Sequence, residues 1–157
     1  MALAAKVLTV SDSAHAGTRA DRSGPSLRSY LVDHGFDVPA LEVVPDGAEA
    51  VGEAIRRLAN GFWGLLVTTG GTGFAPTDHT PEATRSVIDR QAPGLAEAIR
   101  AASPLGPLSR GVAGTLGACL IVNLPGSPTG ALESISSVID VLPHALELLG
   151  GGRPHPG

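Results

Sequence analysis

A cluster of glycines at Gly70, Gly71 and Gly73 is followed, five residues after the last of them, by the carboxylate of Asp78. Glycines lack the side chain that keeps a ligand away from the backbone, and they adopt positive φ, so successive N–H groups can point into one concavity. Asp78 could hold a divalent cation that also binds a phosphate. The cluster therefore predicts an anion site, and the alternative is a tight turn with no ligand.

The familiar phosphate-binding and hydrolase motifs are absent from the sequence. A P-loop needs a lysine after its last glycine, and the only lysine of the chain is Lys6. A dinucleotide-binding fingerprint would need a third glycine at the position of Pro76. No Gly-x-Ser-x-Gly pattern of a serine hydrolase occurs either. The glycine cluster must belong to a different class of phosphate-handling loop.

The elements on either side of the cluster would hold it between a strand and a helix. The apolar run at residues 63–69 is typical of a buried strand. Thr80, Pro81 and Glu82 form a helix start, with a hydroxyl N-cap, a proline at the first helical position and an acid in the first turn.

Polar residues also follow the other predicted strands. Residues 11–13 (Ser-Asp-Ser) follow the strand at 6–10, Asp46 follows the strand at 36–44, and the Pro-Gly-Ser-Pro run at 125–128 follows the strand at 119–124. Taken singly, residues 11–13 are explained by turn chemistry and Asp46 by an N-cap or a turn. In an open parallel sheet, however, ligands bind where such strand ends meet.

The order of strands and helices predicts an α/β fold. Helices with one apolar face are expected after Pro25 and after Gly47, so the first half reads βαβαβα, which implies a parallel sheet covered by helices on both faces. A short helix at 95–100 and an antiparallel hairpin formed by 111–116 and 119–124 should follow. The last helix, residues 132–149, should be kinked or split at Pro143. Residues 14–22 are expected to form a flexible loop.

Length and composition limit the function classes. A chain of 157 residues, 43% of them hydrophobic, suits a single domain over residues 1–150 with a disordered tail at 151–157. A net charge of −4 and few aromatic residues argue against nucleic-acid binding. The five histidines show no paired metal-ligand spacing, and Cys119 lies in an apolar run typical of a core. No apolar run has the length of a membrane span and no signal-type segment is found, so a cytoplasmic protein is expected.

Together the strand-end motifs resemble the MogA and MoaB family of molybdenum-cofactor biosynthesis, which also includes the G domain of gephyrin and its plant counterpart. The matching stretches occur in the expected order along almost the whole chain: TVSDS at 9–13, D-x-S-G at 21–24, PD at 45–46, TTGGTG at 68–73, D-x-T-P-E-A at 78–83, LSR at 108–110 and IVNLPGSP at 121–128. The pair formed by TTGGTG and TPEA is highly specific.

The resemblance implies a three-layer α/β/α fold with a mostly parallel sheet and an antiparallel edge hairpin, a homotrimer, and molybdopterin and ATP as substrates. In the adenylyltransferase members, AMP passes from ATP to the terminal phosphate of molybdopterin with Mg²⁺, and pyrophosphate is released. Asp46 and Asp78 would be the essential acids and the metal ligands. Substrate or nucleotide contacts are expected from Ser11, Asp12, Ser13, Thr69, Gly70, Gly71, Thr72, Gly73, Thr80, Pro81, Glu82, Pro125, Gly126, Ser127 and Pro128.

The chain departs from the family pattern at two positions. Many relatives have arginine where this chain has Thr77, and phenylalanine where it has Leu95. The lost arginine could weaken the binding of one substrate, and Arg110, Arg19 or Arg22 could replace it.

Two other functions stay open at this point. One is a MoaB-like protein that binds molybdopterin without adenylyl transfer, and the other is a phosphate-binding α/β enzyme with an unrelated substrate. The sequence also leaves open whether the assembly is a trimer or a hexamer, which metal ion is preferred, and whether a molybdenum-insertion enzyme is the downstream partner.

Overall fold

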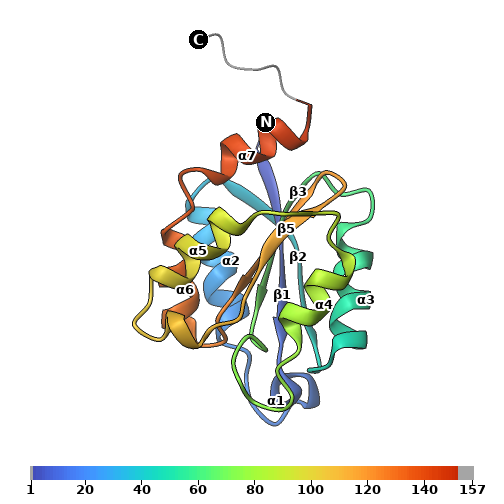
Figure 1. The fold of residues 1–157 in the computed structure, drawn as a ribbon, viewed down its shortest axis with the longest axis vertical. Coiled ribbons are helices and arrows are strands. Elements are labelled where there is room, and N and C mark those ends of the chain that lie inside the picture. The colour runs from blue at the N-terminus through green and yellow to red at the C-terminus, as the bar shows by residue number, and fades with distance from the viewer. Residues whose placement is uncertain (1, 152–157) are drawn as a thin grey trace.

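The structure is a computed structural model that describes residues 2–151. Within these residues a six-stranded sheet has the strand order β2-β1-β3-β6-β5-β4 (Figure 1). The strands are β1 (Leu3–Val10), β2 (Phe36–Val44), β3 (Gly64–Thr69), β4 (Arg90–Gln91), β5 (Ala113–Leu116) and β6 (Cys119–Leu124). The first four strands in the sheet order run parallel, and β5 pairs antiparallel with both β6 and β4. The predicted parallel sheet with an antiparallel hairpin at its edge is confirmed.

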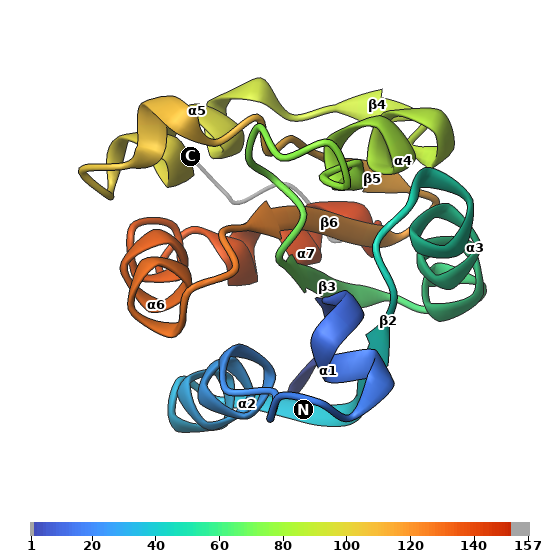
Figure 2. The same ribbon diagram turned by 90° about the horizontal axis from the view of Figure 1, so that it is seen from below.

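Helices cover both faces of the sheet, which gives three layers (Figure 2). One face packs against α2 (Ser23–Asp33), α5 (Pro93–Ala101), α6 (Pro128–Ser136) and α7 (Leu142–Leu149). The other face packs against α3 (Ala48–Ala59) and α4 (Thr80–Val87). The remaining short elements are α1 (Asp12–Ala16) and the 3₁₀ helix η1 (Gly106–Leu108). Within residues 2–151, none of the helices combines the length and the apolar character needed to cross a membrane.

The central strands are apolar on both sides because each face is covered by helices. In β3, Val67 belongs to the core beneath α2, α5, α6 and α7, whereas the preceding residue, Leu66, belongs to the core beneath α3 and α4. Both side chains are fully buried, and each contributes about 1.5–3 kcal/mol by its removal from water. Cys119 is likewise fully buried in the second core, which confirms its interpretation as a core residue.

The last predicted helix is two helices, α6 and α7. The break lies at residues 137–141, ahead of Pro143, which sits in the first turn of α7. Proline fits this position because the first turn of a helix needs no N–H donor there. The predicted split is confirmed, and the proline starts the second helix instead of bending one long helix.

The sequence pattern did not predict three short elements, α1, β4 and η1. Residues 14–22 are not a flexible loop throughout, because Asp12–Ala16 forms α1, capped by the Ser11 hydroxyl, which accepts a hydrogen bond from the Ala14 N–H at 3.2 Å. The helix ends at Gly17, whose φ of 79° is left-handed. The two-residue strand β4 is held by pairing with β5 and has no sequence pattern of its own. Of the predicted tail, residues 152–157 lie outside the described residues.

The carboxyl ends of β1, β2, β3 and β6 all lie at one edge of the sheet. Val10 pairs with Val44, and Thr69 pairs with both Thr9 and Leu124. Parallel register of this kind places the loops after the four strands next to one another. The loops after β1 and β3 lead to helices on opposite faces, α2 and α4, and a crevice is expected at such a switch point.

Candidate active site

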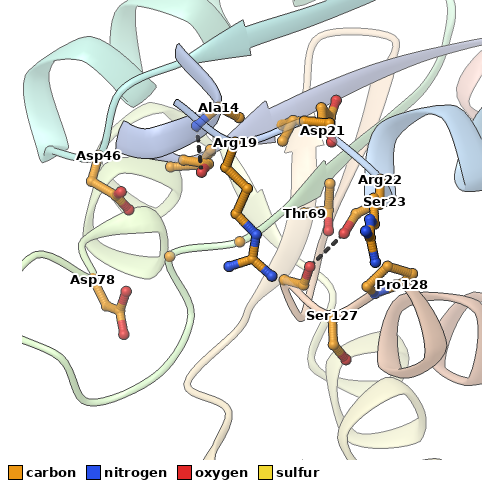
Figure 3. A pocket seen from close by; sticks show the side chains of 17 residues that line it. Ala14, Arg19, Asp21, Arg22, Ser23, Asp46, Thr69, Asp78, Ser127 and Pro128 are labelled. Atoms are coloured by element: carbon orange, nitrogen blue, oxygen red, sulfur yellow. Dashed lines mark hydrogen bonds between the residues drawn. The ribbon is translucent and has the colours of Figure 1, made fainter. Parts of the chain in front are cut away.

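A cavity of about 480 Å³ opens at this edge of the sheet (Figure 3). Four loops contribute to its wall, one after each of the strands β1, β2, β3 and β6. The lining residues are Thr9, Val10, Ser11, Ala14, Arg19, Ala20, Asp21, Arg22, Ser23, Asp46, Thr69, Gly70, Gly71, Asp78, Gly126, Ser127 and Pro128.

The glycine loop has a backbone that other residues could not adopt here. Gly70 and Gly71 have φ of 105° and 70°. A Cβ on Gly70 would collide with the Val10 carbonyl oxygen, and one on Gly71 would collide with the Thr80 hydroxyl. The Gly70 N–H is used by the Leu124 carbonyl at 3.1 Å. The N–H groups of residues 71–73 have no acceptor in the described part of the chain, and Gly71 lines the cavity, so its N–H can donate to an anion there.

Asp46 is placed by a reciprocal pair of hydrogen bonds with Asp12. The Asp12 N–H donates to Asp46 Oδ2 at 3.1 Å, and the Asp46 N–H donates to Asp12 Oδ1 at 3.0 Å. Burial raises the pKa of Asp46, and the negative charges of Asp12 and Asp78 raise it further, against the lowering effect of the Asp12 N–H. A ligand or ion that brings positive charge would relieve this repulsion.

Asp78 is fixed within its own turn. Its Oδ2 accepts a hydrogen bond from the Ala75 N–H at 3.0 Å, and its N–H donates to the Ala75 carbonyl at 2.9 Å. The turn directs the carboxylate into the cavity that Asp46 also lines (Figure 3). The two acids thus reach one cavity from the loops after β2 and β3.

These two acids fit a magnesium ion that binds together with a phosphate. Among residues 2–151, no group of three or more His, Cys, Asp or Glu side chains could hold a metal by itself. Magnesium is commonly held by one or two carboxylates, with the remaining ligands supplied by substrate phosphates and water. Asp46 and Asp78 supply that number of carboxylates.

Arg110 ties the glycine loop to the start of α4. Its guanidinium donates to the Gly73 carbonyl at 2.8 Å, to the Asp78 carbonyl at 2.8 Å and to Glu82 Oε2 at 2.6 Å. Its side chain is therefore occupied, and it does not line the cavity. The hydrogen bond from Arg110 lowers the pKa of Glu82, and the same bond raises the pKa of Arg110. Of the three arginines that could replace a missing one, Arg19 and Arg22 line the cavity.

The loop at residues 125–128 is held by hydroxyl groups. The Thr69 hydroxyl donates to the Pro125 carbonyl at 2.7 Å, and the Ser23 hydroxyl donates to the Gly126 carbonyl. Ser127 caps α6 by accepting a hydrogen bond from the Gly130 N–H at 3.0 Å. The loop brings the amino-terminal end of α6, which favours anions, to the cavity wall.

The structure brings about half of the predicted site residues to the cavity. Those that line it are Ser11, Asp46, Thr69, Gly70, Gly71, Asp78, Gly126, Ser127 and Pro128. Those that do not line it are Asp12, Ser13, Thr72, Gly73, Thr80, Pro81, Glu82 and Pro125.

Several of the latter group have a structural part in the loops. Thr80 is fully buried, and its hydroxyl donates to the Gly70 carbonyl at 2.9 Å, so it supports the glycine loop from behind. The Asp12 carboxylate accepts a hydrogen bond from the Asp46 N–H, and Glu82 forms an ion pair with Arg110. The departures from the family pattern lie away from the cavity: Thr77 is exposed on the loop, and Leu95 packs against the core.

The sequence analysis missed the part of the wall formed by residues 19–23. Asp21 anchors this segment, because its carboxylate accepts hydrogen bonds from the Thr9 hydroxyl at 2.9 Å and from the Gly24 N–H at 3.0 Å. The D-x-S-G pattern at 21–24 was part of the resemblance, and its position after the first strand could have placed it at the site.

The sequence matches a family model described as "Probable molybdopterin binding domain" over residues 6–144. It is 34% identical over 152 residues to molybdopterin adenylyltransferase from Helicobacter pylori strain J99, a match that covers 92% of this chain and 86% of that protein. It is 37% identical over 150 residues to the molybdenum cofactor synthesis protein cinnamon of Drosophila melanogaster. That match covers 92% of this chain and 25% of cinnamon, so the chain spans about a quarter of that relative's length.

A solved structure of the molybdopterin biosynthesis enzyme MoaB from Thermus thermophilus has the same fold, with a TM-score of 0.90 and 46% sequence identity over 98% of this chain and 99% of that one. The fold, the motifs and these matches agree along nearly the whole sequence. The chain belongs to the molybdopterin-binding domain family, the family of MogA and MoaB in molybdenum-cofactor biosynthesis.

Proposed function

We propose that the protein is a molybdopterin adenylyltransferase, which transfers AMP from ATP to the terminal phosphate of molybdopterin and releases pyrophosphate. The observation that carries this proposal is the convergence of Asp46, Asp78 and the glycine loop on one cavity of about 480 Å³. The likeness to a relative named molybdopterin adenylyltransferase, over most of both chains, supports the choice of substrates.

The reaction exchanges one phosphorus–oxygen bond for another. An oxygen of the molybdopterin phosphate attacks the α-phosphorus of ATP, and the bond from that phosphorus to the oxygen bridging to the β-phosphorus breaks. The electron pair leaves with pyrophosphate, so the nucleophile needs no general base when it is already an anion. The protein therefore has to align two phosphates and neutralise their charge.

The residues of the cavity supply these requirements. Asp46 and Asp78 would hold Mg²⁺, which when bound neutralises phosphate charge. The N–H group of Gly71 and the amino-terminal end of α6 lie at the cavity wall, where they favour anionic oxygens.

The test is an assay with purified protein, molybdopterin, ATP and Mg²⁺, in which adenylylated molybdopterin and pyrophosphate are measured together. Asp78→Asn should lower kcat by about 10²-fold or more, because a phosphate site loses a charged ligand. The matched control is Asp37→Asn, an exposed acid on β2 away from the cavity, which should leave the rate unchanged. Full activity of Asp78→Asn would remove the proposed metal-binding role of this carboxylate.

A second function, molybdopterin binding without adenylyl transfer, is favoured by one observation. The solved structure with a TM-score of 0.90 is of a molybdopterin biosynthesis enzyme named MoaB, the name of the group whose resemblance left this function open. Tight binding of molybdopterin together with no product from ATP and Mg²⁺ would select this function. The homotrimer and the transfer of product to a molybdenum-insertion enzyme remain predictions of the family resemblance, and the cytoplasmic location remains a prediction from the sequence pattern.

A further inference from the structure

We infer that Arg19 is a catalytic residue of the transfer, and that its guanidinium binds the α-phosphate of the nucleotide on the side of the cavity opposite Asp46 and Asp78. This inference rests on the proposed function, since it names a residue for the same reaction. It starts from an arginine that lines the cavity and has no partner of its own within the described residues.

Most arginines in the described residues are engaged by the protein. Side-chain hydrogen bonds or ion pairs within 4 Å are formed by Arg28, Arg57, Arg85, Arg100 and Arg110. The guanidinium groups of Arg19, Arg22, Arg56 and Arg90 form none with any residue between positions 2 and 151, and of these four only Arg19 and Arg22 line the cavity, which also contains carboxylates. Their donors are therefore free for a ligand.

The backbone of Arg19 is nevertheless held in place. The N–H groups of Thr18 and Arg19 both donate to the Ser13 carbonyl, at 3.0 and 3.3 Å, and the Thr18 hydroxyl donates to the same oxygen at 3.2 Å. On the other side of Arg19, Asp21 is fixed by the Thr9 hydroxyl. Because the backbone is already ordered, a ligand has to immobilise only the side chain of Arg19.

The direction of the side chain decides what it would bind. Arg19 extends from the loop after α1 into the cavity, toward the space between the two aspartates and Ser127 (Figure 3). Arg22 lies nearer to Pro128, at the start of α2 (Figure 3). The reacting phosphorus should lie next to the acids that would hold Mg²⁺, and Arg19 is the cation that faces them. Arg22 is placed to contact a neighbouring phosphate.

A guanidinium at this position stabilises the charge that the reaction moves. As the bond to the incoming molybdopterin oxygen forms and the bond to pyrophosphate breaks, charge spreads over the non-bridging oxygens of the α-phosphate. The planar, permanently charged fork of arginine can donate to two of these oxygens at once, and lysine cannot. The hydrogen bonds from Arg19 should therefore stabilise the transition state more than the ground state.

The experiment compares Arg19→Gln and Arg19→Lys with Arg56→Gln as the matched control. Arg56 is an exposed arginine on α3 that does not line this cavity, and its side chain has no hydrogen bond or ion pair within the described residues. Steady-state assays give kcat and the KM for ATP and for molybdopterin. Calorimetric titrations with AMP and with adenosine measure binding independently of turnover.

Arg19→Gln should lower kcat about 10²- to 10³-fold, as expected when one donor to a developing charge is lost. It should weaken AMP binding roughly tenfold and leave adenosine binding and the KM for molybdopterin unchanged, because the contact is to the α-phosphate. Arg19→Lys should recover part of kcat, since the charge is kept without the fork. Arg56→Gln should match the unmodified protein in every measurement.

Three results would overturn the role of Arg19: a kcat equal to that of Arg56→Gln, AMP binding that does not change, or a loss confined to the KM for molybdopterin. If the unmodified protein binds AMP but forms no adenylylated product, the proposed function is wrong. The AMP titrations would still test whether Arg19 contacts the α-phosphate.

Discussion

Asp46 holds a negative charge where two other carboxylates already lie. Burial, Asp12 and Asp78 together raise its pKa, so the charged form that a metal would need is less favourable in the folded protein than in the unfolded chain. Sites that must attract a cation commonly carry such repulsion, and they lose stability by it. At the scale of the residue, function and stability therefore oppose each other at Asp46.

Asp46→Asn should raise the melting temperature at pH 7 by about 1–3 °C while it lowers adenylyl transfer. The sign follows from the raised pKa. The unfolded chain loses the Asp46 proton at about pH 3.9, and the folded protein loses it only at a higher pH, so the cost in stability grows as the pH rises above about 3.9 and is absent below it. The difference in melting temperature between variant and parent should narrow between pH 7 and pH 4. A variant less stable than the parent at pH 7 would contradict the destabilising role of this charge.

Cys119 is the second residue whose environment has a measurable consequence. Its side chain is fully buried in the core beneath α3 and α4, and desolvation raises the pKa of its thiol to about 12. The reactive thiolate is therefore scarce at pH 8, and an alkylating reagent cannot reach it.

Iodoacetamide at pH 8 should leave Cys119 unmodified in the native protein and modify it completely in urea. Mass spectrometry measures both, and the rate of modification at intermediate urea should follow global unfolding. Rapid labelling of the native protein would show that the core around β6 opens locally.

At the scale of the element, the loop between β3 and α4 is held from both ends. Thr80 supports it from α4, Leu124 accepts the Gly70 N–H from β6, and Arg110 joins the Gly73 and Asp78 carbonyls. These contacts fix the backbone from which Asp78 reaches the cavity, although Arg110 itself lies outside it. Arg110 is therefore a positioning residue.

Arg110→Ala should lower kcat about tenfold with a small loss of global stability, because a slightly misplaced catalytic group reduces the rate strongly. Arg85→Ala is the matched control, since Arg85 also pairs with Glu82, at 3.8 Å, but donates to none of the loop carbonyls. Arg110→Lys should recover little, because a single ammonium group cannot reproduce the three contacts of the guanidinium. Equal rates for the Arg110→Ala and Arg85→Ala variants would mean that the loop keeps its conformation without the hydrogen bonds from Arg110.

The same loop depends on glycine at one position more than at others. Gly70→Ala should cost roughly 2–4 kcal/mol, because its φ of 105° is strained for any side chain and the new Cβ meets the Val10 carbonyl oxygen. Gly94→Ala, in the first turn of α5, has open space around its Cβ and should instead stabilise by about 0.4–1 kcal/mol. Urea denaturation measures both changes. A Gly70→Ala variant as stable as the parent would show that the loop has another conformation of similar energy.

At the scale of the whole molecule, the sequence was sufficient for those features that depend on strong local patterns. The glycine loop, the helix start at Thr80 and the apolar strands were predicted because positive φ, capping and burial each restrict the residue type. Asp78 was predicted from the glycine cluster that precedes it, whereas the role of Asp46 was implied by the family resemblance, because Asp46 taken alone is explained by an N-cap or a turn. The antiparallel edge hairpin was predicted from the turn between two short apolar runs.

The parts that were missed depend on contacts between segments distant in sequence. The strand β4 exists only through its pairing with β5. Residues 19–23 read as a polar loop, and only the hydrogen bond from Thr9 to Asp21 shows that this loop folds back onto the end of β1. Thr80 belongs to a motif that predicted a substrate contact, but its hydroxyl donates to the Gly70 carbonyl inside the protein. In each case tertiary contacts determine the role, and the local sequence does not specify them.

The central claim is that AMP passes from ATP to molybdopterin in this one cavity. The most direct measurement is a single-turnover reaction with ATP labelled on the α-phosphate, in the presence of molybdopterin and Mg²⁺, with the labelled pterin and the released pyrophosphate quantified together. Both products should form in equal amounts, only when both substrates are present, and they should be lost in the Asp46→Asn and Asp78→Asn variants. Molybdopterin that binds tightly while no label leaves ATP would contradict the claim.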